Sequence, residues 1–356
     1  MRSGCSTRPG PDFPQLQKPV SSASVSPIPQ RNADPAARAP FITNGTDWRD
    51  TRGRPISCHD GCILRVGDEF YWYGTSYRGN PRGLWGRPGA KLQNDFNVYR
   101  SRDLVSWEYA GVCFSFPKHS WLSEGTSHRP NVLYNEGTRK FVLWFFCMAK
   151  ADPEYPDVML AVAEADEPAG PFRFVARRES GEEHGWGQDL GLFKDDDGSA
   201  YLVYDDGHRN IRVDLLSDDY LSSTRRGAVA LPPTHEGAAM IKIKGRYLVA
   251  GSGVFGWAGS ETHGAVADAP LGPYGRKQLL SQRETWGSQI SNFLPIRESG
   301  SILAICDQWW GGDAARGDLE KSRYLFLPVD LDPASNTASL CYRERWNPFA
   351  PAQEIW

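Results

Sequence analysis

The sequence has few residues of the kinds that would point to a metal, a membrane or a nucleic acid. Its 356 residues include seven cysteines, with no Cys-x-x-Cys pair and no Cys/His spacing that suits zinc. No apolar run reaches the roughly 18 residues that a membrane helix needs. The net charge of −3 leaves no excess of Lys and Arg for nucleic acid or an anionic membrane. We therefore expect no metal, no nucleic-acid partner and no membrane span, with most cysteines free and buried.

The amino terminus lacks the features of a folded or exported segment. Residues 1–42 hold no apolar stretch of the kind that a secretory signal needs, and they are rich in Pro, Ser, Ala and Arg. This composition is typical of a disordered tail or of a mis-assigned start. We predict a disordered tail over 1–42 and one folded domain over 43–356. The compartment stays open, because a cytoplasmic protein and a secreted protein with a mis-assigned start fit equally well.

Aromatic residues and repeated strand patterns, by contrast, are plentiful. The chain has 13 Trp, 14 Tyr and 16 Phe, enough to fill a β-rich core and also to stack on sugar rings. Signals for helices are nearly absent. Five segments rich in β-branched and aromatic residues each follow a Gly or a charged turn, which predicts strands: GDEFYWYGT (67–75), TRKFVLWFF (138–146), DGSAYLVYD (197–205), KGRYLVAGS (244–252) and SGSILAICD (299–307).

Each of these five strands follows another short segment that begins with a polar residue and turns apolar at once. Further apolar stretches and turns come after each strand, so that every unit holds about four short strands. Five such units fit an all-β, five-bladed β-propeller, in which the first strand of each blade lines the central channel. The five leading segments are HDGCILRV, RPNVLYNE, QDLGLFKD, EGAAMIKI and SQISNFLPI.

The polar residues of these leading segments are the candidate site. Equivalent positions of the first strands converge on the axis of a propeller, so five side chains are expected to meet in one pocket: Asp60, Asn131, Asp189, Glu236 and Gln289. Each one alone is also explained as a turn residue that starts a strand. Carboxylates held close together raise the pKa of at least one of them. Glycoside hydrolysis needs such a difference, with one carboxylic acid protonated and one carboxylate ionised.

The three acidic segments resemble glycoside hydrolase family 43, whose members are inverting five-bladed propeller enzymes acting on arabinose-, xylose- and galactose-containing glycans. The resemblance extends over nearly all of residues 45–346. HDGCILRVGDEFYWYG is similar to the first-blade motif and implies that Asp60 is the general base. GQDLGLFKDDDGSAYLVY resembles the third-blade motif and implies that Asp189 raises the pKa of the acid and orients it. HEGAAMIKIKGRYLV resembles the fourth-blade motif and implies that Glu236 is the general acid.

Other segments resemble the exo-acting 1,3-β-galactanase branch of this family, among them SHRPNVLYNEGTRKFVLWF, GSGVFGWAGS and TWGSQISNFLP. That branch typically replaces the first-blade Asp, and its fifth-blade Gln is the proposed base. This chain has both Asp60 and Gln289, which leaves the base open between them. It also has His128 where the branch has a Glu, and an imidazole and a carboxylate offer different hydrogen bonds to sugar hydroxyls.

Further side chains are predicted to bind the substrate. Asn131 and Gln289 are expected to hold hydroxyls or the water, and His59 and His128 to bond the sugar, with strand capping as the alternative for His59. Trp257 is expected to stack on a pyranose face, or else to fill a contact between blades.

The resemblance also bears on cofactors, partners and activity. Some relatives hold a cation on the axis beside a fifth-blade His, but the segment around Gln289 has no His. We expect no cofactor, with a structural cation on the axis as the unsupported alternative. We expect a monomer that acts on an oligo- or polysaccharide. The bond would be a β-galactosidic, arabinofuranosidic or xylosidic one, cleaved from a chain end. The alternative is a non-catalytic propeller that only binds glycans.

Overall fold

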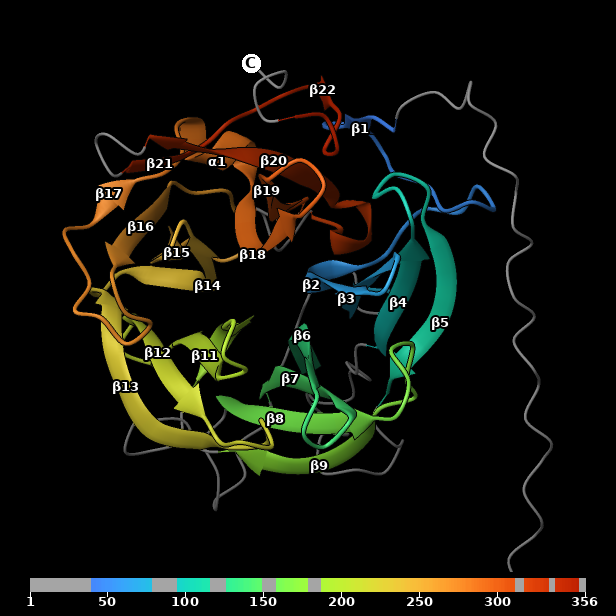
Figure 1. Cartoon of the computed structure of the whole chain (residues 1–356). Helices are drawn as coiled ribbons and strands as arrows, with labels where there is room; N and C mark the ends of the chain where they lie inside the picture. The colour runs from blue at the N-terminus through green and yellow to red at the C-terminus, as the bar shows by residue number, and fades with distance from the viewer. Residues whose placement is uncertain are drawn as a thin grey trace, which may run out of the picture. The chain divides into compact units, whose positions relative to one another are not determined.

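The computed structural model describes residues 40–78, 95–115, 126–148, 158–178, 187–310, 317–332 and 337–351. Five antiparallel sheets of four strands each are arranged around a common centre (Figure 1). The helices within these ranges are a five-residue helix, α1 (Arg283–Gly287), and a 3-10 turn, η1 (Leu319–Lys321). No helix among the described residues has the length and apolar character needed to cross a membrane.

Each sheet is one blade, and its strands follow one another in chain order. Blade 1 holds β2 (His59–Val66), β3 (Glu69–Ser76), β4 (Asp95–Ser101) and β5 (Glu108–Phe114). Blade 2 holds β6 (Thr126–Asn135), β7 (Lys140–Met148), β8 (Val158–Ala165) and β9 (Arg173–Arg178). Blade 3 holds β10 (Gln188–Lys194), β11 (Ala200–Asp205), β12 (Ile211–Leu216) and β13 (Ser223–Leu231). Blade 4 holds β14 (His235–Ile243), β15 (Arg246–Gly253), β16 (Thr262–Ala267) and β17 (Gln278–Leu279). Blade 5 holds β18 (Gln289–Ile296), β19 (Ser301–Gln308), β20 (Arg323–Asp332) and β21 (Thr337–Leu340).

The first strands of the five blades form a closed ring. β2 contacts β6, β6 contacts β10, β10 contacts β14, β14 contacts β18, and β18 contacts β2 again. The predicted all-β, five-bladed propeller with first strands around the axis is therefore confirmed. The five strands predicted from their aromatic content are the second strands of the blades, β3, β7, β11, β15 and β19.

Two short terminal strands join the beginning of the domain to its end. β1 (Ile42–Thr43) pairs antiparallel with β22 (Arg345–Trp346). Next to β1, the side chain of Asn44 donates to the carbonyl of Phe326 and accepts from its N–H, both at 2.9 Å. Ile42, predicted to be the last residue of the tail, is in fact a buried strand residue, so the domain begins before residue 43. Residues 1–39 of the predicted tail lie outside the described residues.

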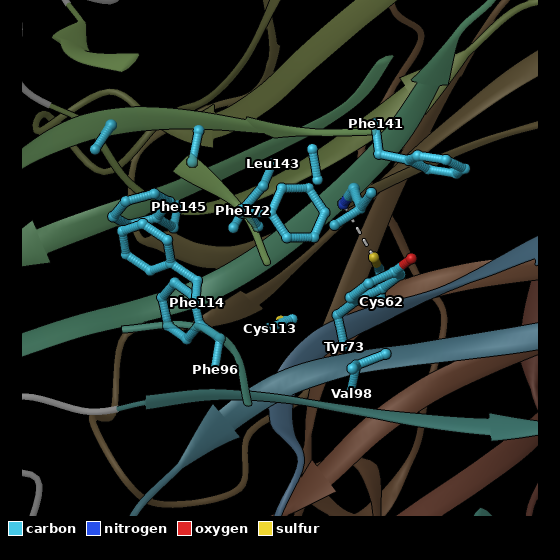
Figure 2. Close-up of a cluster of buried hydrophobic side chains, with 14 of the residues drawn as sticks. Cys62, Tyr73, Phe96, Val98, Cys113, Phe114, Phe141, Leu143, Phe145 and Phe172 are labelled. Carbon is cyan, nitrogen blue, oxygen red and sulfur yellow. Dashed lines mark hydrogen bonds between the residues drawn. The ribbon is translucent and has the colours of Figure 1, made fainter. Parts of the chain in front are cut away.

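The hydrophobic core is divided among the interfaces between blades. Each of five clusters of buried side chains joins two neighbouring blades. Figure 2 shows the cluster between blades 1 and 2, where Phe96 and Phe114 face Phe145, and where the thiol of Cys62 accepts a hydrogen bond from the backbone of Val132. Because every blade is packed on both sides, the first strands are held in fixed positions around the axis. The six cysteines of the described residues are free, and five of them are buried.

Candidate active site

The first strand of every blade is irregular near its beginning. In four blades the first strand has one more residue than its partner directly after the pairs His59↔Thr75, His128↔Phe146, Gln188↔Asp205 and Glu236↔Ser252. In blade 5 the extra residue comes one pair later, after Ile290↔Cys306. In the other four blades the residue after the pair has a positive φ: Asp60 (50°), Arg129 (58°), Asp189 (47°) and Gly237 (67°). Such a bulge bends the strand and redirects a side chain, and positive φ is uncommon for residues other than Gly.

This pairing corrects the predicted register of the five polar residues. Asp60 and Asp189 are equivalent, as predicted, but the blade 2 residue at their position is Arg129, not Asn131. Asn131 is two positions further along and is equivalent to Cys62. Glu236 and Gln289 are one position earlier than Asp60 and are equivalent to His59, His128 and Gln188. Neither the bulge nor the varying length of the turn between the first two strands of a blade is visible in the spacing of the sequence segments.

Glu236 lies in a buried position among charged and polar groups of three other blades. Its side chain is 7% exposed, its Oε1 accepts a hydrogen bond from Gln289 Nε2 at 3.2 Å, and its Oε2 accepts one from Arg209 Nη1 at 3.3 Å. Burial and, next, the negative charge of Asp189 raise the pKa of Glu236 to about 8, against the opposing charges of Arg209 and Arg129. Glu236 is therefore protonated at neutral pH.

Arg129 connects the carboxylates of the site, and the sequence interpretation missed it. Its Nε is 3.5 Å from Asp189 Oδ1, its Nη2 donates to Gln289 Oε1 at 3.0 Å, and its Nη1 donates to the carbonyl of Ile290 at 3.2 Å. The guanidinium is buried, whereas the side chain of Asp189 is 17% exposed. The sequence feature that could have indicated Arg129 is the Pro130 that follows it directly, at the bulge of this blade.

Gln289 is fixed by three partners. Its Oε1 accepts from both Arg129 and the indole of Trp309, the latter at 3.1 Å, while its Nε2 donates to Glu236. Trp309 in turn packs edge-on against Trp257, with ring centroids 4.8 Å apart. The half-buried Trp257 also packs against Tyr77 at 5.6 Å. The structure therefore places Gln289 in contact with Glu236 and connects Trp257 to Gln289 through Trp309.

Asp60 contacts the backbone of Arg129 and is almost completely buried. Its Oδ1 accepts hydrogen bonds from Thr75 Oγ1 at 2.5 Å and from the backbone N–H of Arg129 at 3.3 Å, and its Oδ2 accepts one from the Tyr77 hydroxyl at 2.8 Å. The pKa of Asp60 is raised to about 7: burial and the charge of Asp307 raise it, while the charge of Arg129 opposes them.

Two of the predicted substrate-binding residues have all of their polar atoms occupied within the protein. The fully buried ring of His59 contacts Asp307 Oδ1 and the hydroxyl of Tyr324, each at 3.2 Å. The amide of Asn131 is equally buried; it donates to the carbonyl of Leu190 and accepts from Asn292 at 2.5 Å. The structure does not bring either side chain to Glu236. His128, also buried, contacts Tyr77 at 3.1 Å.

A second pair of charged residues supports Glu236 from blade 3, and it too was missed. Asp205 is fully buried and accepts hydrogen bonds from Gln188 at 2.9 Å and from Arg209 at 2.8 Å. Burial and the charge of Asp189 raise the pKa of Asp205 to about 6. Arg209 thereby bridges Asp205 and Glu236. In the sequence, Asp205 and Arg209 lie in the segment YDDGHRN, which cannot be distinguished from an ordinary turn.

The described residues also bear on the metal prediction. Nowhere in these ranges are three or more His, Cys, Asp or Glu side chains grouped so that they could hold a metal ion. That the protein works without a metal stays a prediction.

The fold corresponds to that of known enzymes. The family model for glycosyl hydrolases family 43 matches residues 54–292. No curated protein matches the sequence. Among solved structures, a family 43 β-1,3-galactosidase with galactodeoxynojirimycin is 27% identical, with a TM-score of 0.71 over 86% of this chain and 100% of that one.

Two further structures give the same picture. The exo-β-1,3-galactanase from Phanerochaete chrysosporium, solved with galactose, is 28% identical with a TM-score of 0.74, over 86% of this chain and 68% of that one. The exo-β-1,3-galactanase from Clostridium thermocellum is 28% identical with a TM-score of 0.73, over 88% of this chain and 67% of that one. Since the family model alone spans more than half of the sequence, the chain belongs to glycosyl hydrolases family 43 and is a glycoside hydrolase.

Proposed function

We propose that this enzyme is an inverting, exo-acting glycoside hydrolase that removes β-linked galactose from the ends of galactose-containing glycans. The observation that carries the proposal is the buried Glu236, whose pKa of about 8 keeps it protonated at neutral pH beside the partly exposed Asp189. The similar structures with known names, a β-1,3-galactosidase and two exo-β-1,3-galactanases, support galactose as the sugar.

In the proposed reaction, Glu236 donates its proton to the glycosidic oxygen as the leaving sugar departs. The carboxylate that results is stabilised by Arg209, whose Nη1 lies 3.3 Å from Glu236 Oε2. Asp189 raises the pKa of Glu236 before the reaction and is itself kept in place by Arg129. Asp60 takes a proton from the water that attacks the anomeric carbon, and the configuration at that carbon inverts.

The position of Gln289 favours Asp60 as the base. An inverting base and its acid are separated by roughly 6.5–9.5 Å, because the sugar and a water lie between them. Gln289 instead donates a hydrogen bond directly to Glu236 at 3.2 Å. We therefore expect Asp60→Asn to abolish turnover, and Gln289→Ala to lower it less. Full activity in the Asp60→Asn variant would refute this assignment.

A cavity beside Arg209 is suited to the leaving part of the glycan. It has a volume of about 720 Å³ and is lined by Arg209, His235, His263, Glu261 and Phe255, among others. Phe255 is 68% exposed and offers an aromatic face for a sugar ring. Since Arg209 also contacts Glu236, we propose that the leaving sugar occupies this cavity. Phe255→Ala should then raise KM for a polysaccharide and leave KM for an aryl galactoside unchanged.

The proposal is tested by measuring which sugar is released and in which anomeric form. Purified enzyme is incubated with β-1,3-galactan, with arabinogalactan and with aryl β-galactosides, α-arabinofuranosides and β-xylosides. Glu236→Gln serves as the control of low activity on the two polysaccharides. We expect free galactose whose α-anomer appears first in proton NMR spectra. If the β-anomer appears first, the mechanism is retaining. Binding of a glycan without release of any sugar would favour a non-catalytic propeller.

A further inference from the structure

A series of buried hydrogen bonds leads from Asp60 to His128. The hydroxyl of Tyr77 lies 2.8 Å from Asp60 Oδ2 and 3.1 Å from His128 Nδ1. On the far side of the ring, His128 Nε2 is hydrogen bonded to the hydroxyl of Thr126. Tyr77 and Thr126 are fully buried, and Asp60 and His128 are each 2% exposed. Bulk water therefore does not replace any of these bonds.

The number of protons fixes the direction of the whole series. An ionised Asp60 only accepts hydrogen bonds, so the single hydroxyl proton of Tyr77 points to Asp60. The Tyr77 oxygen is then the acceptor for His128, whose Nδ1 must carry a proton. A neutral ring protonated on Nδ1 has an unprotonated Nε2, which accepts from Thr126. Burial, together with the charge of Arg129, lowers the pKa of His128 to about 3, so the ring is neutral.

The charges around Asp60 show why its ionised form needs hydrogen bonds from neutral donors. The titratable groups that surround it come from several elements: Cys58 and His59 at β2, Tyr77 after β3, His128 and Arg129 in β6, and Asp307 in β19. Asp307 opposes the ionised form of Asp60, and the favourable charge of Arg129 is shared with Asp189 and Gln289. Hydrogen bonds from neutral donors must supply the rest of the stabilisation.

We propose that His128 is a positioning residue for Asp60: its neutral form, protonated on Nδ1, fixes the hydroxyl of Tyr77 toward Asp60 and keeps this buried carboxylate ionised. A carboxylate at position 128 would compete with Asp60 for the one proton of Tyr77, and one of the two acids would then remain protonated. The inference rests on the proposed function only where it takes Asp60 to be the base.

The tautomer of His128 is measured directly by nitrogen NMR on protein labelled with 15N-histidine. The resonances of His128 are those that disappear in the His128→Gln variant. We expect a protonated Nδ1 and an unprotonated Nε2 at pH 8, and no conversion to the imidazolium down to pH 5. A proton on Nε2 at pH 8, or an imidazolium at pH 5, would overturn the proposal.

The effect on Asp60 is measured by the acidic limb of the pH dependence of kcat/KM. In His128→Gln the amide nitrogen can still donate to Tyr77 and the amide oxygen can accept from Thr126, so we expect the limb to stay within about 0.3 pH units of the wild type. In His128→Glu and in Tyr77→Phe we expect the limb to move up by about one pH unit or more, with an unchanged alkaline limb. A uniform loss of kcat/KM with no movement of the limb would indicate a merely structural role.

The two measurements separate this inference from the proposed function. If no glycoside is hydrolysed, the proposed function fails, and the tautomer alone decides about His128. Thermal unfolding of each variant shows whether it is folded, and Tyr77→Phe, which removes one hydroxyl group, is the smallest change in the set. An unmoved acidic limb in a folded and active Tyr77→Phe enzyme contradicts the proposal.

Discussion

At the scale of single residues, opposite roles follow from the surroundings of the two acids. The pKa of Asp60 is raised to about 7 and that of Glu236 to about 8, in both cases chiefly by burial. Asp60 must be ionised, so the rate falls as the pH drops through 7, and Glu236 must be protonated, so the rate falls as the pH rises through 8. We expect kcat/KM to peak between these values.

The Asp189→Asn variant, which removes a charge that raises the pKa of Glu236, should shift the alkaline limb of the pH dependence of kcat/KM to lower pH. A maximum near pH 5 would contradict both assignments.

The role of Glu236 as a proton donor predicts a dependence on the leaving group. In Glu236→Gln we expect kcat on galactan to fall by about 10²–10⁴-fold, the usual contribution of general acid catalysis. A dinitrophenyl galactoside releases a stable phenolate that needs no proton, and its hydrolysis should be much less affected. Steady-state kinetics on the two substrates check this difference. Equal losses on both would mean that Glu236 is not the acid.

The sequence predicted those site residues that are marked by their own short segment, and it did not predict those that depend on distant parts of the chain. Asp60, Asp189 and Glu236 each stand at the start of an apolar segment in a repeated unit, and the structure places all three around Arg129. Arg129 was not predicted as a site residue, because the bulge that brings it to the axis does not change the pattern of polar and apolar residues in its strand. The burial of His59 could not be predicted either, since it depends on Tyr324, about 265 residues further along the chain.

At the scale of the element, the bulge in β2 depends on a glycine. A Cβ atom at Gly61 would lie 1.9 Å from the carbonyl oxygen of Tyr73 in β3, which is far inside van der Waals contact. We expect Gly61→Ala to separate β2 from β3, to lower the free energy of unfolding by about 1–3 kcal/mol or more, and to displace Asp60. The matched control is Gly137→Ala in an exposed turn, where the nearest atom is a side-chain oxygen of Asn135 at 3.2 Å. Thermal unfolding and kcat/KM are measured on both, and identical behaviour of the two variants would refute the steric argument.

At the scale of the whole molecule, the repeats predicted the fold, but not the way in which the ring is closed. Five similar units, each with a strand rich in aromatic residues, are sufficient to indicate five blades, because each blade is mainly a local structure. The closure involves β1 and β22, two strands of two residues each that carry no periodicity to detect. The pairing of residues about 300 positions apart could be found only in the folded chain.

The closure predicts that a small change near the amino terminus destabilises the whole domain. Asn44 bonds both backbone groups of Phe326 in β20 and also donates to the carbonyl of Arg343 at 2.8 Å. Asn44→Ala leaves the buried N–H of Phe326 without this partner, which costs about 1–3 kcal/mol. We expect a Tm several degrees lower and unchanged kcat/KM at low temperature, since Asn44 contacts none of the acidic residues of the site. Thr46→Ala, which removes an exposed hydrogen bond to the carbonyl of Thr43, is the control and should leave Tm unchanged. If Asn44→Ala melts with the wild type, the terminal strands do not hold the ring together, and the contact between β18 and β2 must close it alone.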